Sequence, residues 1–324
     1  VLRQESYELD VDVLQADEPK DVPVRIYSAA THNCHIQRIQ PRGENKHAVF
    51  LVTESEALSY HYELALPKEP APVSPDPRIA HTLNLRHDEY GNPQQSITIA
   101  YGRVALDQNA HLPQAALIDQ VQTETHIAYT ETRYTKDVIL PEQVVGQTSP
   151  IKHYRLRLPY EIRTYEITGI PKPIGRYFNI NDLRKYALCE DALYPPSVPG
   201  NQQINLTPLL YHQQPQTSGP HRRMVEHVCT RYFDDGDGST GLPKTPTDPL
   251  PLGQHGPRGL KYEDYKLALT NNLLGAVFDA KLNADVLAKL NTATISGYTP
   301  GTAISSSFID QWWMRSGIAG FASD

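Results

Sequence analysis

The sequence predicts a mainly β fold of antiparallel strands, with a small helical portion near the C-terminus. Apolar and polar residues alternate over many short segments, which is the period of a strand buried on one face. The 324 residues also include 27 prolines and 19 tyrosines but only 6 phenylalanines, a composition that suits long, often broken ribbons with one wet face. Because we find no Gly-rich phosphate loop and no strand–helix–strand rhythm, a parallel α/β core is disfavoured.

The clearest predicted element is a hairpin at residues 76–103. Gly91 and Asn92 tolerate positive φ and Pro93 cannot donate to a ladder, so the chain is expected to reverse between residues 88 and 93. The residues expected on one face of the two strands are Ile79, His81, Leu83 and Leu85, followed by Ile97, Ile99 and Tyr101.

Further strands are expected at residues 7–13, 47–52, 58–64, 127–134, 154–167 and 224–233. Within the fifth of these, Glu161 and Arg163 interrupt the pattern, which indicates a bulge or a switch of face. Polar or Pro-rich loops are expected at residues 67–77, 106–120, 192–220 and 234–248.

Helical spacing predicts most of the helices after Gly259. The apolar residues with this spacing are Tyr262, Tyr265 and Leu269, then Leu273, Leu274, Val277 and Phe278, and then Val286, Leu287 and Leu290 behind an Asn283 cap. A shorter helix is expected from an Asn181 cap through residue 187. We therefore expect a β segment at residues 1–258 and a helix-containing portion of the same unit at residues 259–324.

Composition excludes several classes of function. The formal net charge is −7 and no Lys/Arg-rich run is present, so nucleic acid is not an expected partner. No window of 18 uncharged apolar residues and no signal peptide are found, so direct membrane insertion is not expected. The chain starts at Val1, which suggests a piece of a longer protein. Cys34, Cys189 and Cys229 are too few for a disulfide framework and are expected as free thiols.

No metal site or cofactor is expected from the candidate ligands. His32, Cys34 and His35 lack a second ligand pair at zinc spacing, although His227 and Cys229 could join them from a distance. The Asp234–Gly238 segment fails the calcium-loop pattern, because positions five and twelve counted from Asp235 are Ser239 and Pro246.

Neither an active site nor a docking site is clear. Glu54, Ser55 and Glu56 resemble the paired glutamates of ADP-ribosyltransferases, but the arginine and the Ser-Thr-Ser strand of that family have no counterpart. Trp312 and Trp313 are either buried packing anchors or an aromatic docking patch. The chain is therefore expected to be non-enzymatic.

Several segments in order resemble the middle and C-terminal region of the B component of bacterial Tc insecticidal toxin complexes. They are VLRQESYELD at 1–10, HAVFLVTESEALSYHYE at 47–63, DPRIAHTLNLRHDEYGN at 76–92, IAYTETRYT at 127–135, LRLPYEIRTYEITG at 156–169, RRMVEHVCTRYF at 222–233 and LPLGQHGPRGLKYEDYKLALT at 250–270. The Asp-x-Tyr-Gly-Asn turn also resembles the YD or RHS repeat. The pair at Trp312 resembles the family's W-W-x-x-S-G segment.

The resemblance implies a wall segment of an RHS-type shell that encloses the toxic piece of a secreted complex. Its implied partners are the rest of the B component and the RHS-type C component, and indirectly the A pore. The family's propeller and its autocleaving aspartate site lie outside the matched region, so no catalytic residue is implied. The alternatives are a carbohydrate- or surface-binding β-domain of a larger secreted protein, and thirdly an enzyme that uses Glu54 and Glu56.

Overall fold

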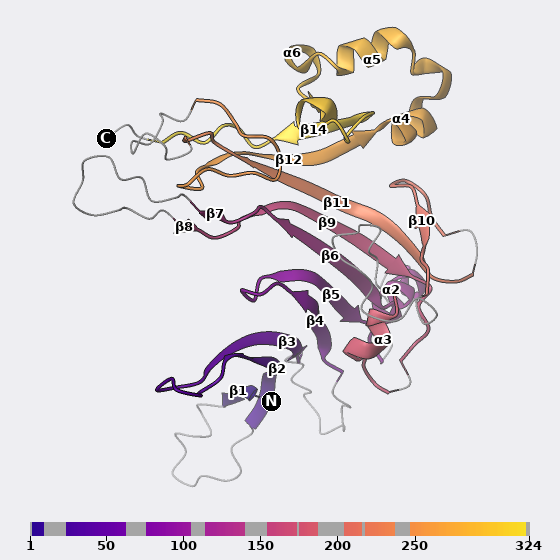
Figure 1. Cartoon of the computed structure of the whole chain (residues 1–324). Coiled ribbons are helices and arrows are strands. Elements are labelled where there is room, and N and C mark those ends of the chain that lie inside the picture. Colours follow the sequence, from indigo (N-terminus) through magenta and orange to yellow (C-terminus); the bar gives the residue numbers. More distant parts are fainter. Residues whose placement is uncertain are drawn as a thin grey trace, which may run out of the picture. The chain divides into compact units, whose positions relative to one another are not determined.

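The protein is mainly β and antiparallel, as predicted (Figure 1). Its residues group into two compact units. The structure, a computed structural model, describes residues 2–9, 24–62, 76–104, 114–139, 154–173, 175–186, 204–215, 218–236 and 247–321. Unit 1 comprises Val1–Tyr129, Glu166–Leu206 and Ser218–Pro220, and unit 2 comprises Thr130–Tyr165, Thr207–Thr217 and His221–Asp324. The expected division at residue 259 stays a prediction.

Unit 1 is built on five strands that pair in chain order, each antiparallel to the next. They are β1 (Leu2–Leu9), β2 (Val24–Gln40), β3 (Val49–His61), β4 (Arg78–His87) and β5 (Pro93–Tyr101). The two segments expected at 47–52 and 58–64 are therefore one strand. Unit 1 also holds helices α2 (Ala115–Thr123) and α3 (Ile180–Arg184).

The hairpin of β4 and β5 forms as predicted. Its expected inward residues include Leu83, Ile97 and Ile99, which are at most 4% exposed. Asp88 organises the turn, because its carboxylate accepts hydrogen bonds from the backbone N–H of Tyr90 and of Asn92, both at 2.9 Å. Gly91 has φ of 87°, a conformation that favours glycine.

Unit 2 contains the strand order β9-β11-β12-β14-β13, with β10 paired in parallel to β11. Strands β6 (His126–Tyr134) and β9 (Pro159–Thr168) contribute residues to both units. The other strands are β7 (Val138–Ile139), β8 (Tyr154–Arg155), β10 (Thr207–Leu209), β11 (His221–Tyr232), β12 (Lys261–Thr270), β13 (Thr299–Pro300) and β14 (Gln311–Arg315). The helices are α4 (Asn271–Phe278), η2 (Asp279–Lys281), α5 (Ala284–Leu290), α6 (Ala293–Ser296) and η3 (Gly301–Ala303).

The prediction of a helix through Tyr262, Tyr265 and Leu269 is wrong. Tyr262, Tyr265 and Leu269 lie on strand β12, which pairs with β11 and β14. The register against β14 shifts between Leu267 and Leu269, and this bulge disturbs the alternation that would have indicated a strand. The next two helices form at α4 and α5, and Asn283 caps α5 by accepting a hydrogen bond from the Val286 N–H at 3.0 Å.

Three other expectations need smaller corrections. The short helix α3 is capped by Asn179 rather than Asn181, because the Asn179 side chain accepts from the N–H groups of Asn181 and Asp182. The expected strand at 154–167 is broken between β8 and β9. Two expected loops hold regular structure, since α2 begins within residues 106–120 and β10 lies within residues 192–220.

Parts of the expected loops lie outside the described residues, namely residues 67–75, 106–113, 192–203, 216–217 and 237–246. Cys189 and the second half of the strand expected at 7–13 also lie there. Among the helices that the structure describes, none combines the length and the apolar composition needed to cross a membrane.

Candidate functional site

The strongest concentration of buried charge in unit 2 surrounds Glu161, which is 3% exposed. Its Oε1 accepts from Nε and Nη2 of Arg163, at 2.8 and 2.6 Å, and lies 2.7 Å from Nε2 of His227. Its Oε2 accepts from Nη1 of Arg133 at 3.1 Å. We call these four residues and Cys229, whose Sγ lies 3.7 Å from Nε2 of His227, the Glu161 cluster.

The cluster explains why Glu161 and Arg163 interrupt the apolar pattern of β9. Glu161 and Ile167 are both buried and share the odd-numbered face of the strand, so the strand does not switch faces there. The interruption instead marks a charged core, with Arg133 supplied by β6 and His227 by β11.

The charges in the Glu161 cluster are fixed by their mutual contacts. Burial alone raises the pKa of Glu161, but the hydrogen bond from His227 and the charges of Arg163 and Arg133 outweigh burial and lower it to about 2. Burial lowers the pKa of His227 and raises that of the Cys229 thiol. Near neutral pH the cluster therefore holds a carboxylate, a neutral imidazole and a protonated thiol.

Glu161, His227 and Cys229 offer three potential metal-ligand atoms within 4.8 Å of one another. A metal would need the Cys229 thiolate, whereas burial favours the thiol. It would also compete for a carboxylate that already accepts from Arg133 and Arg163. The donor set therefore suits an ionic core better than a metal site. His32, Cys34 and His35, the other candidate ligands, lie on β2 of unit 1.

Glu54 and Glu56, the candidate transferase pair, each contact a histidine in unit 1. Glu54 Oε2 lies 2.8 Å from Nδ1 of His32, and Glu56 Oε1 lies 2.9 Å from Nε2 of His81. The pairing register of β3 places Ser55 in a bulge between them. The nearest partners of these carboxylates are therefore imidazoles of neighbouring strands.

His81 continues this contact into the core. It is 1% exposed, and its Nδ1 lies 3.0 Å from the Tyr101 hydroxyl. Burial lowers the pKa of His81 and raises the pKa of Tyr101 to about 12. The Tyr101 phenol is thus protonated at neutral pH, which makes it a hydrogen-bonding group and a poor nucleophile. The local signal was visible in the sequence, because His81 falls on the predicted apolar face.

A hollow of about 400 Å³ in unit 1 lies among β2, β3, β4 and α3. Cys34, His35, His87 and Arg184 are among the residues that line it. Sequence reasoning missed this hollow, since its walls come from segments up to 150 residues apart.

The candidate calcium segment contains an ion pair of its own. Asp235 is fully buried, and its Oδ2 accepts from the backbone N–H and from Nε of Arg258, both at 3.0 Å. Asp237 lies outside the described residues.

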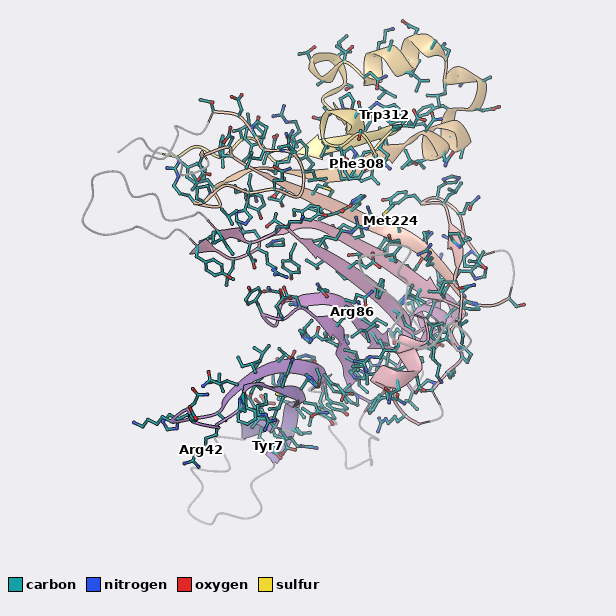
Figure 2. The ribbon with its side chains drawn as sticks, in the orientation of Figure 1. Tyr7, Arg42, Arg86, Met224, Phe308 and Trp312 are labelled. Carbon is teal, nitrogen blue, oxygen red and sulfur yellow. The ribbon has the colours of Figure 1, made fainter. Side chains whose placement is uncertain are left out.

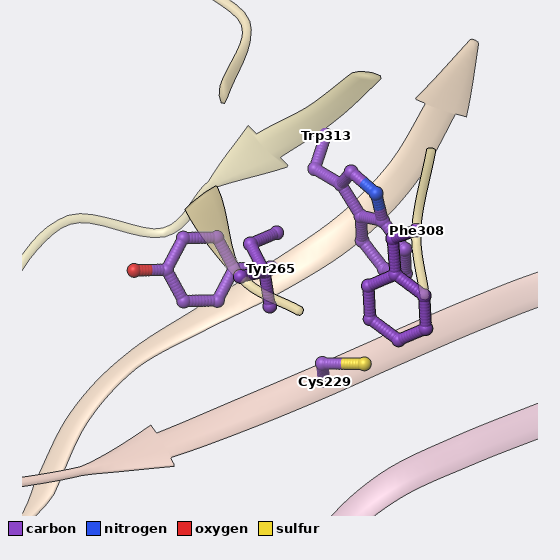
Figure 3. Close-up of a cluster of buried hydrophobic side chains, with 5 residues drawn as sticks. Cys229, Tyr265, Phe308 and Trp313 are labelled. Carbon is purple, nitrogen blue, oxygen red and sulfur yellow. The ribbon is translucent and has the colours of Figure 1, made fainter. Parts of the chain in front are cut away.

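Trp312 and Trp313 are buried in unit 2, with 3% and 0% exposure. Trp313 stacks on Phe308 with ring centroids 4.9 Å apart, in a cluster with Cys229 and Tyr265 (Figure 3). The indole N–H of Trp312 donates to Asn291 at 3.0 Å. Of the two roles expected for this pair, burial favours packing.

Exposed apolar residues gather instead on the hairpin of β2 and β3, whose tip carries Arg42 (Figure 2). Ile36 and Val52 are direct cross-strand partners and are 63% and 57% exposed, and Phe50 beside them is 53% exposed. Exposed apolar side chains grouped in this way make the hairpin a candidate surface for contact with other protein.

The fold of this chain is similar to part of the fold of known TcdB2-TccC3 structures. It is similar to a chain in the crystal structure of TcdB2-TccC3-Cdc42, with a TM-score of 0.51 and 18% identity. Chains of TcdB2-TccC3 without its hypervariable C-terminal region and of TcdB2-TccC3-TEV give TM-scores of 0.52 at 17% and 16% identity. Each match covers 92% of this chain but only 12% of the longer one.

The sequence points to the same family. Residues 1–146 match the model of the family described as insecticide toxin TcdB middle/C-terminal region. The predicted resemblance to the B component of Tc toxin complexes is therefore confirmed. No curated protein matches the chain significantly.

Proposed function

We propose that this chain is a non-enzymatic wall segment of a secreted shell that encloses and delivers the cytotoxic piece of a Tc toxin complex. The observation that carries the proposal is the fold match over 92% of the chain to TcdB2-TccC3 structures, together with the family match of residues 1–146. The proposed partners are the rest of a B component and an RHS-type C component, with indirect contact to the A pore.

The surface of unit 1 supports this role. A wall segment must continue into neighbouring strands, and in the described part of the chain β1 pairs on one side only, with β2. The unpaired edge of β1 is a template for further β structure, and exposed Ile36, Phe50 and Val52 lie farther along β2 and β3. Most of the strongly buried charges have partners within the chain, as the Glu161 cluster does, which suits a passive wall.

Size-exclusion chromatography of the isolated 324-residue chain tests the proposal first. We expect poor solubility or oligomers, since the edge and the apolar patch lack their neighbours. The double variant Ile36→Thr/Val52→Thr should reduce the association, whereas Lys281→Thr/Lys289→Thr, on the helices of unit 2, should not. A stable, monodisperse wild-type monomer would count against a wall segment.

Co-expression with a longer RHS-type partner provides the second test. We expect the chain to co-purify with that partner and the enclosed cargo to resist protease until the shell is denatured. Hydrolysis of NAD by the purified chain that is lost in Glu56→Ala would instead support the transferase. Binding of glycans without any association with the RHS-type partner would support the carbohydrate-binding domain.

A further inference from the structure

Residues 175–186, here called the cover segment, pack on the inward face of the β3–β5 sheet in unit 1. Phe178 is 6% exposed and Leu183, on α3, is fully buried. The Tyr177 ring contacts the rings of Tyr60 and Tyr101, with centroids 6.2 and 5.1 Å apart. The cover segment therefore shields an aromatic and apolar patch from water.

Two hydrogen bonds fix the cover segment to the strands beneath it. The Phe178 N–H donates to the Tyr101 hydroxyl oxygen at 2.9 Å. The Arg184 Nη2 donates to the Leu85 carbonyl at 3.1 Å. Leu85 is the extra residue of a β-bulge, since Asn84 pairs with Ser96 and Arg86 with Gln95. Its carbonyl is therefore available to a group outside the ladder.

His81 lies under this attachment point and joins it to Glu56. Its Nε2 faces a carboxylate oxygen of Glu56 at 2.9 Å, and its Nδ1 faces the Tyr101 oxygen at 3.0 Å. Of the two neutral tautomers, only the one with the proton on Nε2 supplies a donor to Glu56. In that tautomer Nδ1 accepts the Tyr101 O–H, while the Tyr101 oxygen accepts the Phe178 N–H. Each donor and acceptor in this series of hydrogen bonds, from Glu56 to Phe178, then has a partner.

Protonation of His81 breaks this arrangement. A proton on Nδ1 turns it into a donor, so the Tyr101 O–H must leave and find another acceptor in a buried site. The titratable and charged groups around the imidazole are Glu56 and Tyr60 on β3, Tyr101 on β5, and Tyr177 with Arg176 on the cover segment. Glu56 favours the charged imidazole, but its side chain is 38% exposed and its charge is partly screened by water.

We propose that His81 is an acid-sensitive latch that holds the cover segment closed at neutral pH and loosens it when the imidazole is protonated. Opening of residues 175–186 exposes His81 to water, where it takes up a proton readily. Acid therefore favours the open form. The latch does not depend on the proposed wall function.

The size of the response follows from linkage. Burial, the larger effect, lowers the pKa of His81 below its ordinary value of 6.5 in the closed form, despite the opposing effect of Glu56. If only the open form binds the proton, the opening equilibrium rises by up to about tenfold from pH 7.5 to pH 5.5.

Amide hydrogen exchange of the intact 324-residue chain, measured by mass spectrometry and corrected for intrinsic exchange rates, tests the latch. We expect the opening constant of peptides that contain Phe178 to rise severalfold over this pH range. His81→Gln cannot titrate and should abolish the rise. The control is His61→Gln, which replaces an exposed histidine on β3 and should leave the rise unchanged.

A direct titration keeps the test decisive if His81→Gln fails to fold. Histidine C2-proton exchange in the wild-type chain gives the pKa of His81, and the latch requires a value below 6.5. A value at or above 6.5 overturns the proposal. So does an opening constant that does not change with pH, or a rise that persists in a folded His81→Gln variant.

Discussion

Replacement of Glu161 by Gln should destabilise unit 2 strongly at neutral pH. Gln keeps the shape of the side chain but removes the charge that compensates Arg133 and Arg163, and its amide would place a donor opposite Nη1 of Arg133. The pKa of Glu161 is lowered from 4.5 to about 2, which at 1.36 kcal/mol per pH unit corresponds to about 3 kcal/mol. This agrees with the ~3–5 kcal/mol typical of a broken buried ion pair.

The pH dependence gives the sign of the effect. Because the folded-state pKa is depressed, the unfolded chain binds the proton first as the pH falls. The stabilisation by Glu161 is therefore complete above pH 4.5 and is lost as the pH falls toward 2. The difference between wild type and Glu161→Gln should shrink over the same range.

Urea unfolding followed by tryptophan fluorescence measures this effect, because both tryptophans of the chain are buried in unit 2. Glu54→Gln is the matched control, since the Glu54 side chain is 45% exposed and its pair with His32 should contribute at most about 1 kcal/mol. A loss below about 1 kcal/mol for Glu161→Gln at pH 7, or a difference that stays constant down to pH 3, would refute the reasoning.

Two further substitutions test the packing and the turn. In Gly301→Ala a Cβ would lie 2.1 Å from the Phe308 carbonyl oxygen, so we expect a loss of about 1–3 kcal/mol in the tryptophan-detected transition. Gly275 lies on helix α4, and a Cβ added there would meet no other group within 4 Å. Gly275→Ala should therefore stabilise by about 0.5–1 kcal/mol; equal effects of the two substitutions would contradict the packing argument. Asp88→Ala removes the acceptor of the Tyr90 and Asn92 N–H groups and should accelerate amide exchange in β4 and β5 by at least about tenfold. Glu44→Ala, in the exposed turn of the neighbouring hairpin, should leave that exchange unchanged.

Local sequence patterns predicted the hairpin of β4 and β5 well, because its face alternation and its turn chemistry agree. They failed at Lys261–Thr270 because the groups that make it a strand lie far away in sequence. Glu263 is fully buried on β12 and accepts from Nε of Arg315 on β14 at 2.7 Å. Because Glu263 is a charged residue in a buried position and Ala268 is a bulge, apolar and polar residues do not alternate regularly along Lys261–Thr270.

The buried charges could be predicted only in part, for the same reason. The sequence singled out Glu161 and Arg163 as an interruption, but their partners Arg133 and His227 belong to other strands. Glu54 and Glu56 form a pair in the sequence, but in the structure Ser55 bulges between them and each contacts a different histidine. Residue types can indicate that a polar core exists, whereas the pairing register of the strands determines which side chains contact each other.

The bulges also bear on how such chains tolerate insertions and deletions during evolution. A one-residue deletion within a regular ladder moves every following side chain to the opposite face. A deletion of Ala268 would instead remove the extra residue that separates Leu267, opposite Trp313, from Leu269, opposite Trp312. Bulges are therefore the places where an odd change in length can be absorbed, and alignments of distant relatives should place their single-residue gaps there.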